Sequence, residues 1–203
     1  MTVRNSENIM ELIESDYFVD SAFDAIDLIP IDKNLAYKRL LDLAANGSIL
    51  SMIYVGDAYL YGDAFCKDPT EGLKWLRRAS DAGSKDAMFR IACHYRWLKD
   101  FSSARNEFLK LAELKYSPAI YILGHMEYAG EGSDVNIERA VEFWKMAGGM
   151  GHFYGRQWYS YLLRQGYRGV FGKINGVGII VKMLIPFIYY RLYFPKSDRL
   201  RTC

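Results

Sequence analysis

The sequence is poor in the residues that most often build catalytic and metal centres. Of its 203 residues, 3 are cysteine and 3 are histidine, and no two cysteines have the CxxC spacing of a zinc or redox site. The spacings of His94, His125 and His152 match no metal-binding motif. No serine, cysteine or carboxylate stands in a recognisable nucleophile–base arrangement. We therefore expect a protein that is not an enzyme and that uses no cofactor and no metal.

The cysteines and the N-terminal residues indicate the cellular compartment of the protein. Cys66, Cys93 and Cys203 are an odd number of cysteines, which predicts free thiols and a reducing compartment. Residues 1–8 contain no apolar stretch of the kind that forms a secretory signal. We expect a cytoplasmic location, either free or at the cytoplasmic face of a membrane.

A strong excess of charge is also missing, because the formal net charge is only +2. Residues 1–31 hold one basic and seven acidic residues, whereas residues 164–203 hold eight basic residues and one acidic residue. The charge therefore lies at the two ends and not along the body, which argues against an extended nucleic-acid groove. We expect no nucleic-acid partner.

A repeat of small residues is the most informative feature that is present. The first mark of this repeat falls at intervals of 36, 32 and 36 residues, at Ala36, Gly72, Ala104 and Ala140. A second mark follows eleven residues later each time, at Gly47, Gly83, Lys115 and Gly151. A fixed period of 20–50 residues is typical of arrays of helix pairs. Such arrays generally bind other molecules along an extended surface.

The pattern places two helices in each repeat. The first helix begins after the second mark, at about residues 49–61, 85–98, 118–129 and 154–165. The second helix carries the small residue, and the glycines after it are expected to end it because glycine readily adopts a left-handed conformation. Position twelve after the second mark holds Tyr59, Tyr95 and Leu163, but Glu127 breaks this column. The predicted fold is an all-α, right-handed α-solenoid of antiparallel helix pairs with about three and a half repeats, because the fourth repeat has no clear second helix.

Two segments, 59–83 and 123–147, resemble Sel1-like repeats. The first reads Tyr59-Leu-Tyr-Gly62, then Asp68-Pro-Thr-Glu-Gly72 and Trp75-Leu-Arg-Arg-Ala79; the second has Gly124, Tyr128, Gly130, Gly132, Ala140 and Phe143-Trp144 in register. The resemblance covers residues 32–166, although the loop at 98–103 is four residues shorter and looks like a tetratricopeptide turn. It implies a non-enzymatic scaffold that binds a protein partner. By analogy it also implies an adaptor at a membrane, or alternatively a soluble accessory protein of a bacterial envelope or exopolysaccharide pathway.

In solenoids of this kind the first helices line a concave groove. If this chain follows that geometry, residues three, six, ten, thirteen and fourteen after each second mark point inward; in the fourth repeat these include Tyr154 and Gln157. Aromatic side chains mixed with Arg, His and Gln suit a peptide or a sugar chain, although each tyrosine has an equal claim to a packing role between repeats. The predicted partner-binding residues are Asp57, Tyr61, Phe89, Arg96, Trp97, Tyr121, His125, Tyr128, Tyr161 and Arg164.

Residues 1–31 form an acidic N-terminal region that we expect to contain capping helices. The end repeat of a solenoid otherwise leaves an apolar face in water. A partner-binding arm is the alternative. The candidate capping side chains are Ile9, Leu12, Ile13, Tyr17 and Phe18.

Residues 167–203 form a basic C-terminal region with an apolar stretch at 177–194, which we expect to be a hydrophobic helix. This stretch is at the short limit for a membrane span, which needs about 20 apolar residues, and it suits a helix lying on an anionic membrane surface. The alternatives are that it supplies the missing second helix of the fourth repeat and a cap, or that it is buried against another protein. The candidate membrane-contacting residues are Ile179, Ile180, Lys182, Leu184, Ile185, Phe187, Tyr190 and Arg191.

Overall fold

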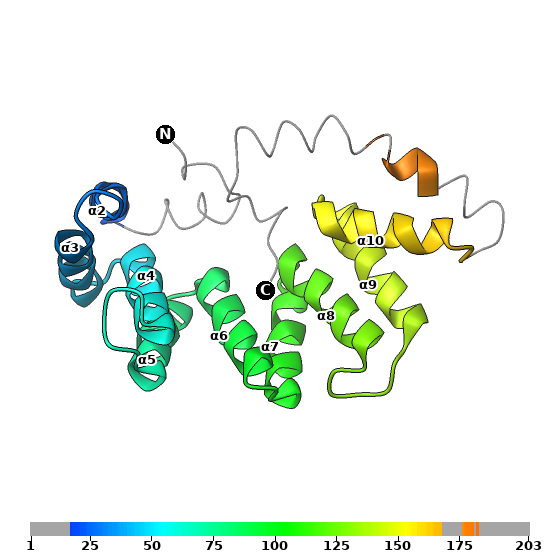
Figure 1. Ribbon diagram of the computed structural model, residues 1–203, viewed down its shortest axis with the longest axis horizontal. Helices are drawn as coiled ribbons and strands as arrows, with labels where there is room; N and C mark the ends of the chain where they lie inside the picture. Colours follow the sequence, from blue (N-terminus) through cyan, green and yellow to red (C-terminus); the bar gives the residue numbers. More distant parts are fainter. Residues whose placement is uncertain (1–16, 168–175, 181, 183–203) are drawn as a thin grey trace. The chain divides into compact units, whose positions relative to one another are not determined.

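The structure is a computed structural model that describes residues 17–167, 176–180 and 182 (Figure 1). Within these ranges all regular secondary structure is helical, which confirms the all-α prediction. The helices are α2 (Val19–Asp27), α3 (Lys33–Ala45), α4 (Ile49–Tyr61), α5 (Pro69–Asp81), α6 (Lys85–Trp97), α7 (Phe101–Glu113), α8 (Ser117–Ala129), α9 (Ile137–Gly149) and α10 (Phe153–Arg164).

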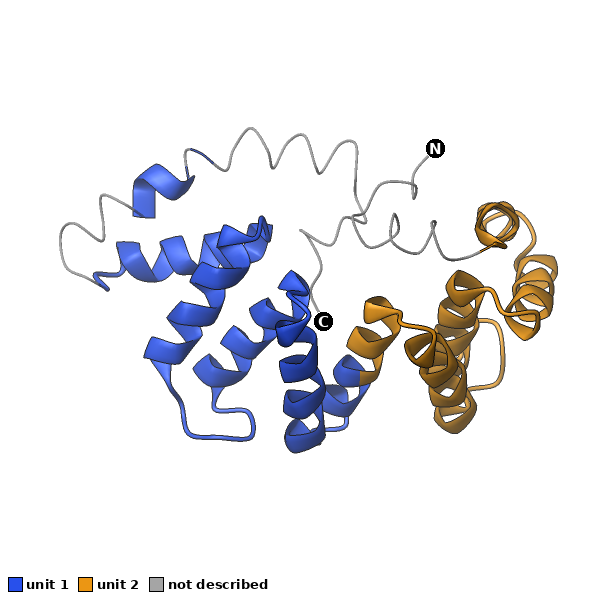
Figure 2. Cartoon of the chain, turned by 180° about the vertical axis from the view of Figure 1, so that it is seen from behind, with its two compact units in different colours: residues 1–6, 92–203 blue, residues 7–91 orange. Residues whose placement is uncertain are grey.

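The chain divides into two compact units, shown in blue and orange in Figure 2. Unit 2 comprises residues 7–91, and unit 1 comprises residues 92–203 together with 1–6. The division falls inside α6. We describe each unit by itself.

Helices that follow one another in the chain pack against one another in each unit. In unit 2, α3 packs on α4 and α4 on α5; in unit 1, α7 packs on α8, α8 on α9 and α9 on α10. This consecutive pairing is the architecture of an α-solenoid. The first helices α4, α6, α8 and α10 begin and end within one residue of their predicted bounds.

Each second helix begins with the same side-chain hydrogen bond. An Asp or Asn side chain accepts from the backbone N–H three residues later, which satisfies a donor that the helix itself leaves unpaired. These caps are Asp32, Asp68, Asp100 and Asn136. The backbone N–H groups of the last three also donate to the carbonyl groups of Tyr59, Tyr95 and Glu127, at 2.9, 3.0 and 2.9 Å. The shorter second loop is therefore anchored at the same two points as the longer ones.

The small residues of the repeat lie where helices approach most closely. A Cβ atom on Gly72 of α5 would lie 2.8 Å from the carbonyl oxygen of Gly56 in α4. A Cβ atom on Gly124 of α8 would lie 2.5 Å from the indole nitrogen of Trp144 in α9. Ala36, Ala104 and Ala140 are likewise completely buried. The repeat of small residues thus reflects helix-to-helix contact.

The second marks end helices through a left-handed backbone, as predicted. Gly47, Gly83 and Gly151 have φ values of 108°, 91° and 92°. Lys115 occupies the same position with a φ of 56°, a region that costs a non-glycine residue free energy.

Helix α2 lies within the N-terminal region where capping helices were predicted. α2 packs on α3 and α4, and it buries Phe23 and Ile26. Tyr17 is 94% exposed and therefore covers no repeat, whereas Phe18 is partly buried. The other three candidates, Ile9, Leu12 and Ile13, lie outside the described residues.

The array of repeats continues beyond Gly166 into a helical turn at residues 176–180. Gly176 stands 36 residues after Ala140, which is the repeat period, and it is buried. A Cβ atom there would lie 2.8 Å from the carbonyl oxygen of Ser160 and 3.1 Å from Cβ of Leu163, both in α10. Gly176 therefore continues the series of first marks after Ala140 and follows the first helix of the fourth repeat, where the predicted pattern had no small residue.

The described part of the C-terminal region contains little of the predicted membrane segment. No helix within the described ranges combines the length and the apolar character needed to cross a membrane. Ile179 and Ile180 are partly buried and Lys182 is exposed. The remaining candidates, Leu184, Ile185, Phe187, Tyr190 and Arg191, lie outside the described residues.

The expectation of free thiols holds for one described cysteine and fails for another. Cys66 is a free and exposed thiol. Cys93 is disulfide-bonded.

Candidate aromatic pocket on α8 and α10

Aromatic side chains from α8, α9 and α10 gather in unit 1. The ring of His125 lies 4.6 Å from that of Tyr121, 5.1 Å from Trp144 and 5.0 Å from Trp158, measured between centroids. Trp144 and Trp158 stack at 5.1 Å with an interplanar angle of 27°. Because Trp144 is completely buried, it supports the more exposed ring of Trp158 from behind.

A cavity of about 440 Å³ opens beside this cluster. Its size falls within the range of about 300–1,000 Å³ that is usual for ligand sites. The lining residues are Tyr121 from α8 and Tyr154, Gln157, Trp158 and Tyr161 from α10. The four residues of α10 are spaced i, i+3, i+4 and i+7, so one face of a single helix supplies most of the wall. We call this site the aromatic pocket.

The described residues that line the aromatic pocket are neutral. Burial raises the pKa of Tyr121 to about 12, so its hydroxyl stays protonated at neutral pH. Hydrogen bonding by the Trp158 side chain acts in the opposite direction and lowers this pKa, but burial has the larger effect.

His125 backs the pocket as a neutral imidazole. Burial, followed by the positive charge of Arg96, lowers the pKa of His125 to about 4. Its Nε2 atom is buried and has no hydrogen-bond partner among the described residues. The Arg96 guanidinium is held by Glu131 through two hydrogen bonds of 2.7 and 3.0 Å.

The depressed pKa of His125 predicts that unit 1 loses stability in mild acid. The unfolded chain binds a proton near the ordinary pKa of 6.5 and the folded chain only near 4, so stability is fully present above 6.5 and is lost as the pH falls toward 4. We expect a loss of about 1–2 kcal/mol, less than the full shift implies because His125 is only partly buried. Urea denaturation at pH 7 and pH 4.5 measures it. A His125→Phe variant should lack this component, and equal pH dependence in both proteins would contradict the assignment.

Glu127, which breaks the repeat column, forms a buried ion pair. Its side chain is 1% exposed and pairs with Arg105 from α7 and, at 3.4 Å, with Arg139 from α9. Its carboxylate therefore joins three successive helices of unit 1. This arrangement is structural and leaves no surface for a ligand.

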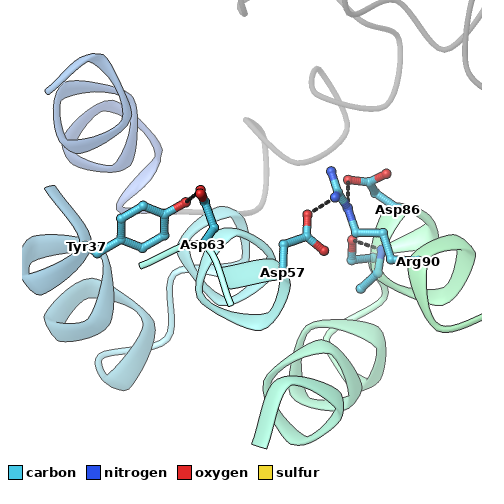
Figure 3. A network of polar contacts seen from close by, with 7 residues as sticks. Tyr37, Asp57, Asp63, Asp86 and Arg90 are labelled. Carbon is cyan, nitrogen blue, oxygen red and sulfur yellow. Dashed lines mark hydrogen bonds and ion pairs between the residues drawn. The ribbon is translucent and has the colours of Figure 1, made fainter. Parts of the chain in front are cut away.

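A second polar network lies in unit 2 (Figure 3). Arg90 of α6 pairs with Asp57 of α4 and donates to Asp86 at 3.2 Å. Separately, the hydroxyl of Tyr37 donates to Asp63 at 3.4 Å. Because Arg90 bridges Asp57 of α4 and Asp86 of its own helix, the network has the character of a structural ion pair between helices.

The predicted groove residues of unit 1 fall into three groups. Tyr121 and Tyr161 line the aromatic pocket, and His125 lies behind it. Tyr128 is 38% exposed and its ring lies 5.9 Å from Trp158. The others are Arg96, which is paired with Glu131, Arg164, which is exposed, and Trp97, which is 66% exposed.

The predicted groove residues of unit 2 differ in how far they are exposed. Asp57 is paired with Arg90, and Tyr61 is 65% exposed. Phe89 is 5% exposed, so it offers a partner almost no surface. No group of three or more metal-ligating side chains occurs in the described ranges of either unit.

Trp158 is a pocket residue that was not among those predicted. The groove rule selects positions three, six, ten, thirteen and fourteen after the second mark, and Trp158 stands seven after Gly151. The spacing of Tyr154, Trp158 and Tyr161 was the available signal, because aromatic residues at i, i+4 and i+7 share one helical face.

Comparison with known proteins agrees with these observations. The Sel1 repeat family matches residues 49–84 and 117–152, which cover the α4–α5 and α8–α9 pairs. A Sel1 repeat protein from Oxalobacter formigenes superimposes with a TM-score of 0.64 at 20% identity, over 74% of this chain and 64% of that one. The antigen c5321 of uropathogenic Escherichia coli, which has an SLR fold, superimposes with a TM-score of 0.61 at 20% identity, over 77% of this chain and 34% of that one. This chain therefore spans less than two thirds of either structure, and no curated protein matches it.

The fold and the repeats define an α-solenoid of antiparallel helix pairs. Two segments of the chain match the Sel1 repeat family, and the helical repeat fold is that of Sel1-like repeat proteins. Members of this family are generally non-catalytic scaffolds for protein–protein interaction.

Proposed function

We propose that this protein is a scaffold that holds a segment of a partner protein in the aromatic pocket of unit 1. The observation that carries the proposal is the cavity of about 440 Å³, lined by four aromatic side chains and one glutamine. Exposed tyrosine and tryptophan side chains in a well-packed pocket are the residues that most often dominate binding energy at interfaces.

The packing behind the pocket supports a role in binding. Trp158 rests on Trp144, which is completely buried, and on His125. A wall that is already fixed loses little conformational entropy when a ligand arrives, which favours affinity. Tyr161 is 42% exposed and so remains free to contact a partner. Arg164 lies one turn beyond it at the end of α10, where it would contact the same partner.

A peptide-library selection tests this function directly. Peptides are selected on the full chain, and their affinities for the Tyr161→Ala variant are then measured by calorimetry. We expect at least a tenfold loss, which corresponds to about 1.4 kcal/mol. Tyr17→Ala is the matched control because Tyr17 is also an exposed tyrosine, at 94%, and lies in unit 2. Selected peptides that bind both variants equally would contradict the proposed site.

We also propose that the C-terminal region caps the solenoid. The burial of Gly176 against Ser160 and Leu163 supports this interpretation for residues 176–180. By the repeat register, Ile180 corresponds to Leu40, Leu76, Phe108 and Trp144, which are all completely buried. Membrane contact by Ile179 and Ile180 is therefore not part of the proposal, and neither is a role in envelope polysaccharide assembly.

Sedimentation with lipid vesicles separates the capping role from membrane binding. We expect the full chain to stay in the supernatant with vesicles that contain anionic lipid at physiological salt, because its apolar side chains at 179 and 180 are used in packing. Vesicles of neutral lipid are the control for trapping. Sedimentation with anionic but not neutral vesicles would show that the basic C-terminal region binds a membrane surface and would overturn the capping proposal as stated.

A further inference from the structure

The exposed polar groups of the aromatic pocket can donate hydrogen bonds to a ligand. Among the described residues, no lining side chain carries a carboxylate. The exposed lining residues are Tyr161 and Gln157, whose hydroxyl and amide groups can donate to a carbonyl oxygen and can also accept. A ligand that offers carbonyl acceptors beside an apolar surface fits this set.

Proline-rich peptide has this composition. Proline has no backbone N–H, so a proline segment can be buried against aromatic rings without leaving a donor unsatisfied, while its carbonyl groups remain available to accept. A sugar chain presents many hydroxyl donors, and no described lining residue carries a carboxylate to accept from them.

The spacing of the rings on α10 agrees with this chemistry. Tyr154 and Tyr161 are seven residues apart on one helix, which is about 10.5 Å along the axis. One turn of a polyproline II helix is three residues long and rises about 9 Å. Two prolines one turn apart would therefore meet the two tyrosines, with Trp158 between them. Polyproline II segments bind aromatic-lined grooves at low entropic cost because they are already extended.

We propose that the aromatic pocket formed by α8 and α10 binds a proline-rich segment of a partner protein in the polyproline II conformation. This inference rests on the proposed function, since it names the chemistry of the partner for the same site. Tyr154 and Tyr161 form the two ends of the platform, Trp158 forms its centre, and Gln157 donates to a peptide carbonyl.

Calorimetric titration of the full chain with a decaproline peptide tests the inference. A ten-residue Gly-Ser peptide and cellohexaose are the matched flexible and carbohydrate probes. We expect decaproline to bind at least tenfold more tightly than either probe, Tyr161→Ala to weaken it at least tenfold, and Tyr161→Phe to weaken it less because the ring is kept. Tyr17→Ala should bind as the unchanged protein does. Since Tyr161 is 42% exposed, its replacement should leave the fold intact, which thermal denaturation followed by circular dichroism checks.

Three results would overturn the inference, and they differ in what they leave standing. Decaproline binding no tighter than the Gly-Ser peptide, or tighter binding of cellohexaose, would remove the proline assignment. Library peptides that depend on Tyr161 but contain no proline would also remove it while leaving the proposed function intact. If neither decaproline nor any library peptide depends on Tyr161, both the inference and the proposed function fail.

Discussion

Replacement of Glu127 with alanine is expected to lower the free energy of unfolding of unit 1 by about 3–5 kcal/mol, the range for removing one partner of a buried ion pair. Glu127 is 1% exposed, and Arg105, its main partner, is 16% exposed. Without the carboxylate, the Arg105 guanidinium would keep its positive charge in a site that excludes most water. One of its nitrogens, Nη1, is already buried with no described partner. Urea denaturation of the two proteins measures the difference.

Two further variants show whether the loss comes from the unpaired charge. Glu113→Ala removes an exposed carboxylate at the end of α7 and should change stability by less than about 0.5 kcal/mol. The double variant combines Glu127→Tyr with Arg105→Leu. Tyr95 is the residue that corresponds to Glu127 one repeat earlier, and Leu73 is the residue that corresponds to Arg105. Apolar replacement of a buried ion pair is often neutral, so the double variant should be more stable than Glu127→Ala. A cost below about 1 kcal/mol for Glu127→Ala would contradict the account of this ion pair.

Replacement of Gly72 with alanine is expected to destabilise unit 2 by about 2–3 kcal/mol, the upper part of the range for an overpacked core. A Cβ atom at this position would lie 2.8 Å from the carbonyl oxygen of Gly56 and 2.9 Å from the backbone nitrogen of Leu60. Both neighbours are backbone atoms of α4, so the strain can be relieved only if α4 and α5 move apart. The midpoint of urea denaturation should fall accordingly.

Gly149→Ala is the matched control for this change. Gly149 is also helical, but an added Cβ would meet nothing within 4 Å. Alanine is the better helix former by up to about 1 kcal/mol, so the variant should be as stable as the original protein or slightly more stable. Equal effects of the two substitutions would show that close helix approach is not the reason for glycine at position 72.

The helices were predictable because the repeated small residues lie where helices pack closely. A small residue is required wherever two helices touch, as at Gly56 and Gly72, and a glycine or an Asp/Asn cap marks each helix end. These local requirements recur in every repeat, so the bounds of the first helices could be predicted from the spacing alone. Gly176 shows the limit of that reasoning, because five glycines between 166 and 178 obscured which one carried the period.

The candidate site was only partly predictable because it depends on tertiary contacts. Tyr121 and Tyr161 were selected by the groove rule, but that rule passes over Trp158, whose stacking on Trp144 of α9 is a tertiary contact. Phe89 was selected by the same rule and is buried, since periodicity alone does not say which face of a helix its neighbours cover. Glu127 looked like a defect in the column, and only its partners on α7 and α9 reveal an ion pair.

The central claim is that a partner segment binds the aromatic pocket, and the four tryptophans of the chain provide a direct test. Each tryptophan gives one indole N–H resonance in a proton–nitrogen NMR spectrum, so a titration with a library-selected peptide follows Trp75, Trp97, Trp144 and Trp158 together. The account predicts that the Trp158 resonance shifts with the largest amplitude, because Trp158 lines the pocket, and that the Trp75 resonance of unit 2 stays in place. Saturable binding that shifts Trp75 and leaves Trp158 unchanged would contradict it.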